Sequence, residues 1–347
     1  MNTFGINGFG RIGRTAFRIW WMYHRDRLEL KAINTSGSMP VKDWVHLLKY
    51  DSNYGIFTEP ITYTETQSPK EVTEENSVIG TISIGGRTIT VTAQRDPAKI
   101  PWGSLGVQTV IESTGVFTSA DKAGLHLQGG AQKVIISAPA KGEGVPTNVI
   151  GVNETGEPGA IMSNASCTTN CISPVAAVMH SVFGVAKAML TTIHSYTDDQ
   201  NLHDNSHRDM RRARAAALNI VPTSTGAAIA TTEVIPELKG LFDGLSMRVP
   251  TPVGSLSDMV FVTKRKTSVE EVNQAMRDAT QQPRWKGILA VSEAGESLVS
   301  RDIIGRPESA IVDLELTQVI DGDLVKVIAW YDNEFGYCCR LVEQVGR

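Results

Sequence analysis

The stretch Asn7-Gly8-Phe9-Gly10-Arg11-Ile12-Gly13 decides the fold of this chain. It contains the spacing Gly-x-Gly-x-x-Gly, directly after an apolar run at residues 3–6 and at the start of a helical pattern that continues to about Tyr23. A strand, a glycine-rich loop and a helix in this order are typical of a dinucleotide-binding unit. In such a unit Gly8 makes a tight turn, Gly10 lets the backbone approach a pyrophosphate, and Gly13 lets the helix pack against the strand.

The end of the next predicted strand, residues 28–34, bears on the choice of cofactor. An acidic residue there hydrogen-bonds the adenine ribose of NAD and repels a 2′-phosphate. This chain has Asn34-Thr35-Ser36-Gly37-Ser38 instead, and its hydroxyl groups could bind a phosphate. The residues therefore favour NADP or the use of both cofactors, although a turn that only weakens NAD binding is an alternative.

The remaining apolar patterns predict an α/β chain. A helix at residues 43–50, a hairpin at 81–91 and buried strands at 107–112 and 133–137 complete a doubly wound Rossmann domain over residues 1–166. Alternating patterns then predict an α+β catalytic domain with a mainly antiparallel sheet over residues 167–330. Its predicted strands are residues 186–194, 244–249, 256–263, 310–316 and 324–330, with a helix at 268–281. A C-terminal helix within residues 331–347 is expected to return to the first domain.

Cys167 is the candidate nucleophile. It lies in Ser163-Asn164-Ala165-Ser166-Cys167-Thr168-Thr169-Asn170-Cys171, where small polar residues precede an apolar helical pattern. A helix N-terminus lowers the pKa of a thiol and favours the thiolate, so we expect a lowered pKa for Cys167. The alternative is a small buried hydrophobic residue, which is the usual fate of a free cysteine. Cys171, one turn further on, is expected to pack, although it could trap an oxidised Cys167 as a disulfide.

His194 and two arginines are candidates for the rest of the site. His194 ends an apolar strand before a polar loop, which makes it a candidate base for the cysteine. Arg212, in a basic run before the Thr225-Gly226 loop, and Arg248, in an apolar strand, suit a phosphate or carboxylate. A surface salt-bridge network is the alternative interpretation of the basic run.

Composition narrows the function classes. The 347 residues are 41% hydrophobic and 20% charged with a net charge of −4, which gives no reason to expect nucleic-acid binding. No apolar run reaches the ~18 residues of a membrane helix, and Met1 leads directly into a strand rather than a secretory signal. The four cysteines have neither disulfide-framework nor zinc spacing. We therefore expect a cytoplasmic protein without a bound metal.

Longer motifs make the chain similar to the phosphorylating glyceraldehyde-3-phosphate dehydrogenase family over nearly its whole length. The motifs are the glycine-rich stretch, the Cys167 stretch, and His194-Ser195-Tyr196-Thr197, Arg211-Arg212-Ala213-Arg214-Ala215, Met247-Arg248-Val249-Pro250-Thr251-Pro252 and Trp330-Tyr331-Asp332-Asn333-Glu334. The resemblance implies that Cys167 attacks glyceraldehyde 3-phosphate, that His194 takes the proton, and that inorganic phosphate releases the thioester as 1,3-bisphosphoglycerate. It also implies NAD or NADP as cofactor and a homotetramer.

The resemblance also assigns individual residues. Thr197 and Arg248 correspond to the family's substrate-phosphate residues. The attacking phosphate corresponds to Ser166, Arg212, Thr225 and Gly226, with Thr168 between the two phosphates. The cofactor residues that it adds to Gly8, Gly10, Gly13, Asn34 and Ser36 are Arg11, Ile12, Thr35, Arg95, Ser113, Thr114, Ser137, Asn333 and, near the nicotinamide, Tyr337.

Two departures from the family pattern concern the cofactor. Thr35 stands where NAD-specific members have Asp, and Asn205-Ser206 stands where they have Leu-Pro, on a loop that reaches the neighbouring subunit's cofactor. The NADP-accepting photosynthetic members resemble this chain in having Ser at the second of those positions, so Thr35 and Ser206 favour NADP or dual use. Alternatives for the whole chain are an erythrose-4-phosphate dehydrogenase and a non-catalytic nucleotide-binding regulatory protein.

Overall fold

In the computed structural model, the glycine-rich stretch connects β1 (Asn2–Asn7) to α1 (Arg11–Ile19). The predicted helix continues past Ile19 as a π-helical turn, Trp20–His24, before β2 (Leu28–Asn34). Gly8 has a φ of +91°, and a Cβ on Gly13 would lie 2.1 Å from the Gly8 carbonyl oxygen. Glycine is therefore required at both positions for α1 to start this close to the turn.

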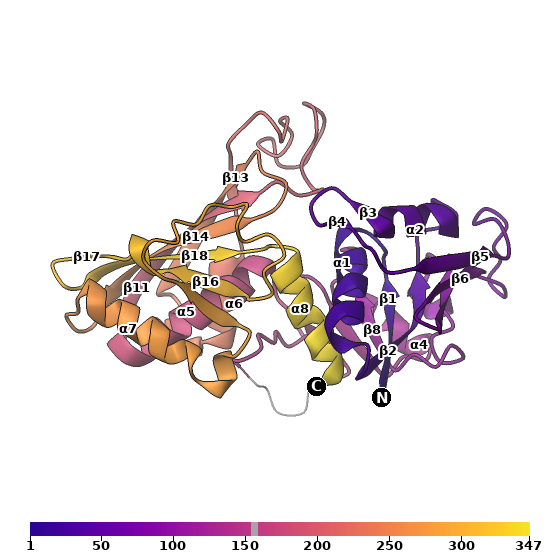
Figure 1. Cartoon of the computed structure of the whole chain (residues 1–347), viewed down its shortest axis with the longest axis horizontal. Coiled ribbons are helices and arrows are strands. Elements are labelled where there is room, and N and C mark those ends of the chain that lie inside the picture. Colours follow the sequence, from indigo (N-terminus) through magenta and orange to yellow (C-terminus); the bar gives the residue numbers. More distant parts are fainter. Residues whose placement is uncertain (154–158) are drawn as a thin grey trace. The chain divides into compact units, whose positions relative to one another are not determined.

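The structure describes residues 1–153 and 159–347, which fall into two units (Figure 1). The first unit comprises residues 1–147, 159–165 and 338–347, and the second comprises residues 148–153 and 166–337. Each unit contains one large sheet with its own buried core.

The sheet of the first unit has the strand order β10-β9-β8-β1-β2-β7-β6-β5. Its remaining strands are β5 (Ile61–Glu65), β6 (Val78–Ile84), β7 (Arg87–Thr92), β8 (Thr109–Glu112), β9 (Lys133–Ile136) and β10 (Ile161–Ser163). Neighbouring strands from β10 to β7 run parallel, whereas β5, β6 and β7 pair antiparallel. The predicted doubly wound fold is confirmed. The chain leaves β1 for β2 on one side and returns to β8 on the other, so the strand order switches at β1, where such sheets bind ligands.

Short helices and a small ribbon complete the first unit. They are α2 (Val41–Lys49), α3 (Ala120–Ala123), α4 (Leu125–Gln128) and the pair β3 (Tyr50–Asp51) and β4 (Gly55–Ile56). α2 begins two residues before the predicted start because Pro40 occupies its N-cap, where a proline fits.

The sheet of the second unit has the order β12-β13-β11-β14-β18-β16-β15, with β17 beside β18. The strands are β11 (Val185–Ser195), β12 (Val221–Ser224), β13 (Phe242–Val249), β14 (Ser255–Thr263), β15 (Leu289–Ser292), β16 (Ala310–Asp313), β17 (Gln318–Ile320) and β18 (Leu324–Tyr331). Among the described strands of this second sheet, only the β11–β13 and β15–β16 pairs are parallel. The predicted, mainly antiparallel sheet is therefore confirmed. The strand predicted to reach Leu316 ends at Asp313, because a 3-10 turn at Leu314–Leu316 separates β16 from β17.

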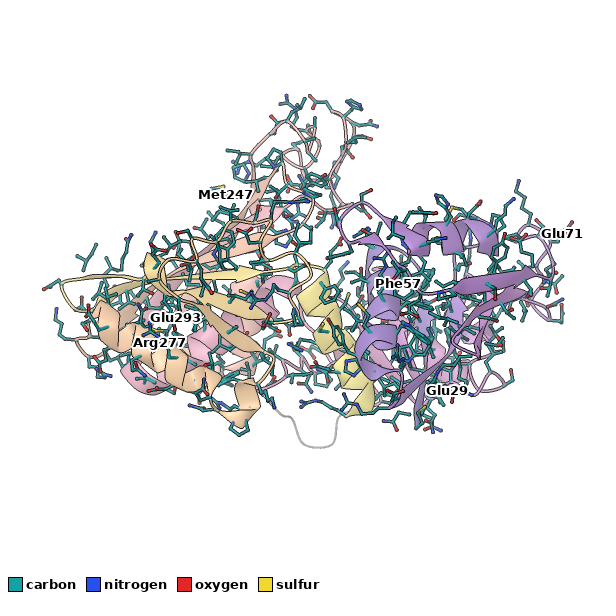
Figure 2. All side chains as sticks on the ribbon, viewed as in Figure 1. Glu29, Phe57, Glu71, Met247, Arg277 and Glu293 are labelled. Atoms are coloured by element: carbon teal, nitrogen blue, oxygen red, sulfur yellow. The ribbon has the colours of Figure 1, made fainter. Side chains whose placement is uncertain are left out.

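Helices α5 (Cys167–Phe183), α6 (Ala227–Val234) and α7 (Val269–Thr280) pack on this sheet (Figure 1). Ser268 caps α7 by accepting the Glu271 N–H, and Arg277 on α7 forms an ion pair with Glu293 at 2.7 Å (Figure 2). The predicted closing helix is α8 (Phe335–Glu343), followed by a 3-10 turn at Gln344–Gly346. None of the helices in the described residues is long and apolar enough to span a bilayer.

A row of buried polar side chains links four neighbouring strands at the carboxyl edge of the first sheet. Glu112, Asn7, Asn34 and Thr92 end β8, β1, β2 and β7, and the strand register pairs each with the next. The Asn7 amide donates to Glu112 at 2.5 Å, the Asn34 amide donates to Asn7 Oδ1 at 2.7 Å, and the Thr92 hydroxyl donates to Asn34 Oδ1 at 2.8 Å. We call this set the carboxyl-edge row.

His126 completes the hydrogen bonding of the Glu112 carboxylate. Trp102 Nε1–H donates to His126 Nδ1 at 3.0 Å, which leaves the ring proton on Nε2. Nε2 then donates to Glu112 Oε2 at 2.9 Å, while the Thr114 N–H donates to Oε1 at 2.8 Å. The carboxylate is thus buried with a full set of donors, which is the condition for burying a charge without a large penalty.

Glu112→Gln tests how much this carboxylate stabilises the first unit. The new amide would direct N–H groups at Thr114 or at the donors of Asn7 and His126, so we expect a loss of about 2–3 kcal/mol in the free energy of unfolding. Thermal and urea unfolding followed by circular dichroism measure it. The control is Glu29→Gln, which removes a half-buried partner of Lys31 and should cost less than about 0.5 kcal/mol. Equal effects of the two substitutions would contradict the assignment.

Candidate active site

Cys167 is the first residue of α5. Ala165, two residues earlier, has a φ of +56°, and its N–H donates to Ser163 Oγ at 3.0 Å. Ser166 is the N-cap, and its hydroxyl accepts the Thr169 N–H at 3.0 Å. The cap uses one of the free N–H groups of the first turn, so those nearer the start of α5 face the position next to the thiol.

His194 lies beside Cys167, near the end of β11. Its Nε2 is 3.4 Å from Cys167 Sγ, and its Nδ1 is 2.7 Å from the Ser195 carbonyl oxygen. We assign the ring proton to Nδ1, because a carbonyl can only accept. Nε2 is then unprotonated and faces the thiol as a base, which is the arrangement of an activated nucleophile.

Burial corrects the expectation of a lowered thiol pKa. Desolvation raises the pKa of the Cys167 thiol, and it outweighs the opposing effects of the Arg248 charge and the hydrogen bonds of Thr168. Desolvation, with the same Arg248 charge, lowers the pKa of His194 to about 3. Helix position alone predicted ionisation of the thiol into solvent. Because desolvation disfavours either charge alone, the thiolate instead forms when Sγ passes its proton to Nε2.

Buried hydroxyl groups pack next to the Cys167–His194 pair. Tyr331 OH lies 2.8 Å from Thr168 Oγ1 and 2.8 Å from Thr192 Oγ1, and its ring packs edge-on against His194. The hydroxyl of Thr168 thus contacts Tyr331 in the core. Cys171 is a buried free thiol whose pKa is raised by desolvation, in keeping with a packing role.

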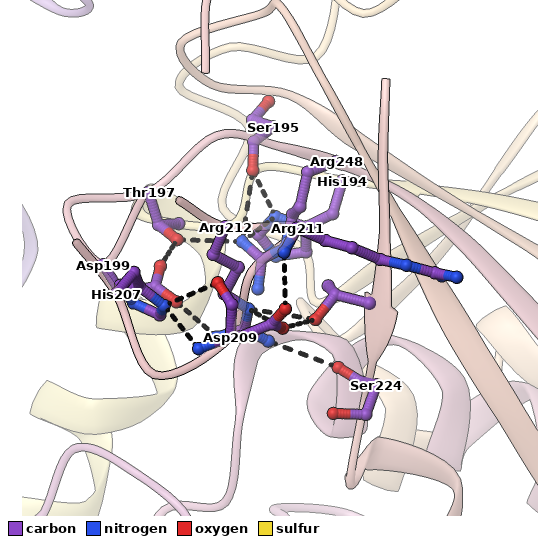
Figure 3. Close-up of polar contacts among 11 residues, drawn as sticks. His194, Ser195, Thr197, Asp199, His207, Asp209, Arg211, Arg212, Ser224 and Arg248 are labelled. Carbon is purple, nitrogen blue, oxygen red and sulfur yellow. Dashed lines mark hydrogen bonds and ion pairs between the residues drawn. The ribbon is translucent and has the colours of Figure 1, made fainter. Parts of the chain in front are cut away.

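Three predicted anion-binding residues gather beside His194 (Figure 3). Arg248 Nη1 donates to Thr197 Oγ1 at 2.9 Å and lies 3.1 Å from His194 Nδ1. Asp199, which the sequence analysis did not single out, accepts hydrogen bonds from Thr197 and from Arg212. Its carboxylate stands where an anionic ligand would meet these cations. Burial raises the pKa of Asp199, but the combined lowering by Thr197, Arg248 and Arg212 is larger. The net pKa is therefore below the ordinary value.

The other predicted phosphate residues lie on the neighbouring loop. Arg212 Nε donates to Thr223 at 3.0 Å and Nη2 donates to the Ser224 carbonyl at 3.4 Å, so the basic run is tied to the loop that contains Thr225. Gly226 is the N-cap of α6, without a side-chain cap. The Ala227 N–H donates to Thr225 Oγ1 at 3.2 Å, and the exposed Gly226 leaves the rest of this helix start accessible to an anion.

The predicted cofactor residues of the first unit line a cleft of about 510 Å³ at the carboxyl edge of its sheet. The lining includes Gly8, Gly10, Asn34, Thr35, Ser36, Arg95, Ser113 and Thr114. α1 starts at this cleft with no side-chain cap and no acidic residue in its first turn, where Arg11 and Ile12 lie. A Cβ on Gly10 would meet no atom within 4 Å, so the approach to the helix start is open. This arrangement fits a dinucleotide pyrophosphate.

Several of these side chains have their polar groups committed to the protein itself. The Asn34 amide also bonds Gln94, which fills all four of its hydrogen-bonding positions. The Thr35 hydroxyl is buried and donates to the Thr92 carbonyl at 3.1 Å, and the Ser113 hydroxyl donates to the carbonyls of Asn7 and Gly8. These residues shape the cleft, and the exposed Ser36 and Arg95 are left to contact a ligand.

The remaining predicted cofactor residues lie elsewhere. Gly13 packs against Gly8, and Ser137 follows β9 with its N–H on the Glu112 carbonyl. Ser206, Asn333 and Tyr337 belong to the second unit. Asn333 Oδ1 is buried and accepts from the Gly254 N–H and the Ser255 hydroxyl. The described residues contain no group of three or more His, Cys, Asp or Glu side chains that could hold a metal ion.

A Rossmann unit with an open glycine-rich cleft and a second unit with a cysteine–histidine pair beside an arginine cluster define a dehydrogenase that forms a covalent thiol intermediate. Family models narrow this class. A model described as glyceraldehyde 3-phosphate dehydrogenase, NAD binding domain, matches residues 2–120. A second, described as glyceraldehyde 3-phosphate dehydrogenase, C-terminal domain, matches residues 166–333. The chain belongs to the glyceraldehyde-3-phosphate dehydrogenase family and is an NAD(P)-dependent oxidoreductase.

Individual relatives agree over nearly the full length. The chain is 52% identical over 342 residues to glyceraldehyde-3-phosphate dehydrogenase 2 of Streptomyces arenae, which covers 98% of this chain and 96% of the relative. It is 50% identical over 342 residues to the chloroplastic glyceraldehyde-3-phosphate dehydrogenase GAPB of Arabidopsis thaliana, with 97% and 72% covered. It is 48% identical over 340 residues to the chloroplastic glyceraldehyde-3-phosphate dehydrogenase A of Chlamydomonas reinhardtii, with 97% and 86% covered.

His194→Asn tests the transfer of the thiol proton. Without Nε2 as acceptor, the half-buried thiol must ionise into solvent with a raised pKa, so we expect alkylation of Cys167 by iodoacetamide at pH 7 to slow by at least about tenfold. The rate should also rise further with pH than in the unaltered protein, because the thiolate appears only as the pH passes that raised pKa. Mass spectrometry of the alkylated peptide measures both effects. His46→Asn, an exposed site in the first unit, is the control. An unchanged rate and pH profile for His194→Asn would contradict the role of Nε2.

Proposed function

We propose that this chain catalyses the oxidative phosphorylation of D-glyceraldehyde 3-phosphate to 1,3-bisphosphoglycerate, with NADP or NAD as the hydride acceptor. The observation that carries the proposal is the 3.4 Å approach of Cys167 Sγ to His194 Nε2 at the start of α5. A thiol with a free base in this geometry can add to an aldehyde, and loss of a hydride from the adduct gives a thioester, which holds the energy of the oxidation until phosphate arrives.

The first step makes the covalent intermediate. Sγ attacks the aldehyde carbon, its proton moves to Nε2 and then to the carbonyl oxygen, and the product is a hemithioacetal on Cys167. The charge that develops on the oxygen is stabilised by N–H groups at the start of α5 with help from His194, a type of contact worth roughly 3–4 kcal/mol. Desolvation disfavours a charge on either group alone, which favours transfer of the proton as the new bond forms.

The second step oxidises that carbon. His194 Nε2 takes the hydroxyl proton of the hemithioacetal, which leaves a thioester once the hydride has departed. When bound, the nicotinamide supplies the acceptor for that hydride. A phosphate oxygen then attacks the thioester carbon, the carbon–sulfur bond breaks, and Sγ regains its proton from Nε2.

Two anion sites serve these steps. Arg248 and Thr197 hold the phosphate of the substrate, and Ser166, Arg212, Thr225 and Gly226 hold the attacking phosphate. The first assignment is supported by the contact of Arg248 with both Thr197 and His194, because a phosphate bound by Arg248 would lie near the base. The second is supported by the open start of α6 beside Arg212.

The cofactor is NADP or both cofactors, held by the first unit. The support is the absence of a carboxylate from residues 34–38 and from the lining of the cleft, together with the exposed Ser36 and Arg95. Ser206, on a loop of the second unit, adds to the selection from a neighbouring subunit. Erythrose-4-phosphate dehydrogenase is the second candidate, and the Thr223–Gly226 loop beside Arg212 favours the phosphate-dependent reaction over it.

We further propose a homotetramer that acts in the cytoplasm. The loop from residue 200 to 214 carries exposed Leu202 and Met210, and these apolar side chains suit burial against another subunit. Four free cysteines without a disulfide suit a reducing compartment. Sedimentation of the active protein should give a mass four times that of the chain, and a fully active monomer would contradict the assembly.

Initial rates of cofactor reduction test the function and the cofactor choice together. With glyceraldehyde 3-phosphate and phosphate, we expect turnover with NADP at least equal in kcat/KM to turnover with NAD, and loss of both in Cys167→Ser. A preference for NAD of about a hundredfold, or 2.7 kcal/mol, would refute the assignment of NADP. Turnover with neither cofactor would favour a non-catalytic nucleotide-binding protein.

Arg248→Met tests the substrate-phosphate site. Removal of a charge-assisted contact should lower kcat/KM for glyceraldehyde 3-phosphate by about 10- to 100-fold. The change should be less than about threefold for unphosphorylated glyceraldehyde, because it has no phosphate for Arg248 to bind, whereas any effect of Arg248 on His194 would lower the rates of both substrates alike. Arg301→Met, an exposed arginine of the same unit, serves as the control. Equal losses for the two aldehydes would show that Arg248 does not contact the phosphate.

A further inference from the structure

The turn after β2 has few groups of its own for a 2′-phosphate. A role for this turn in binding a 2′-phosphate rests on the proposed use of NADP, because the adenine ribose lies at the end of the second strand of a Rossmann unit. The Thr35 hydroxyl donates to Thr92 and is buried, so its proton is already used. Ser36 and Ser38 are exposed and bond each other at 2.9 Å. Two hydroxyl groups supply no positive charge, and a phosphate dianion needs cations from elsewhere.

A second hollow adjoins the cofactor cleft at this turn. It has a volume of about 490 Å³, and Ser36, Gln94 and Arg95 line both it and the cleft. On its other side it is lined by residues of the loop between β5 and β6, including Lys70 and Glu74. Figure 2 labels Glu71 on the same loop. Lys70 therefore faces a hollow that opens onto the predicted ribose position.

The β5–β6 loop is held in place by hydrogen bonds at both ends and by a contact in its middle. The Thr66 N–H donates to the Ile79 carbonyl at 3.0 Å, and the Ala93 N–H donates to the Ser77 carbonyl at 2.8 Å. Between them, Pro69 packs on Gly37, since a Cβ on Gly37 would lie 3.7 Å from the Pro69 carbonyl oxygen and 3.9 Å from its Cβ. Lys70 follows Pro69 directly, so its backbone is fixed beside the turn although its side chain is exposed.

The charges in this hollow are favourable to an anion. Glu74 is its one acidic lining residue among those described, and it forms an ion pair with Lys99. Lys70 and Arg95 have no ion-pair partner within the described part of the chain, and Arg95 only donates to the Ser36 carbonyl at 3.4 Å. Two available cations on opposite walls of a solvent-open hollow can both reach one phosphate.

We infer that Lys70 is a specificity-determining residue, which binds the 2′-phosphate of NADP together with Arg95 from the opposite wall of the hollow. The β5–β6 loop thereby replaces the missing side-chain recognition at Thr35. NAD has a hydroxyl at this position and gains nothing from Lys70.

The experiment measures Lys70→Met in the full-length enzyme with both cofactors. We expect the KM for NADP to rise about fivefold, as for an exposed charge pair, with kcat unchanged and the KM for NAD within twofold of the unaltered value. The Kd of 2′,5′-ADP, measured by calorimetry, should rise by a similar factor while that of ADP stays constant. Lys70→Arg should keep both constants close to those of the unaltered protein.

Lys42→Met is the matched control. It removes the same charge from an exposed lysine of the same unit that lines a neighbouring hollow but lines neither the hollow of Arg95 nor the cofactor cleft, so it measures the effect of surface charge in general. An equal change for NADP and NAD in Lys70→Met, no change for either, or the same change in Lys42→Met would overturn the assignment of Lys70.

Failure of the proposed function gives a different result. An unaltered protein that turns over neither cofactor would refute the dehydrogenase, and the 2′,5′-ADP measurement would still decide whether Lys70 binds the phosphate. An unaltered protein that turns over NAD alone and binds 2′,5′-ADP no better than ADP would keep the dehydrogenase and overturn the role of Lys70.

Discussion

The carboxyl-edge row is the constraint on which the first unit depends. Four parallel strands end side by side, and each contributes one polar side chain to a continuous run of buried hydrogen bonds from Glu112 to Thr92. Buried polar groups of this kind are stable only when every donor and acceptor has a partner. The strands are thus fixed in register at the edge where a ligand binds. The cleft above the row takes its shape from residues that offer the ligand little hydrogen bonding of their own.

The second unit follows a different principle, in which low polarity around the reacting atoms controls their charge. The Cys167 thiol and the His194 ring are packed against Tyr331 and the start of α5, and desolvation disfavours either charge alone. The chemistry therefore depends on a short distance across which a proton can move, rather than on a thiolate that waits in solvent.

The sequence predicted the fold well because its signals are local. Gly8 and Gly13 have backbone requirements that only glycine meets. In strands such as β11 and β18, apolar and polar residues alternate along the sequence. Cys167 and His194 could be singled out because each sits at the end of an apolar element. The charge state of Cys167 could not be predicted, since the helix start is visible in the sequence and the burial that opposes it is not. Asn34 and Thr35 were read as ligand contacts for the same reason. Whether a polar side chain faces a ligand or its own backbone depends on partners such as Gln94 and Thr92, about 60 residues away.

The place of Asp199 has a consequence for ligand affinity. Its carboxylate already satisfies Arg212 and Thr197, so the positive charge of the cluster in Figure 3 is partly neutralised before any phosphate arrives. An incoming phosphate displaces the Asp199 carboxylate from these groups. The observed affinity is therefore the difference between the interactions of the phosphate and those of the carboxylate. A site built in this way stays ordered when empty and holds its ligand loosely. Those two properties suit an enzyme that must take up one phosphate compound and release another in every cycle.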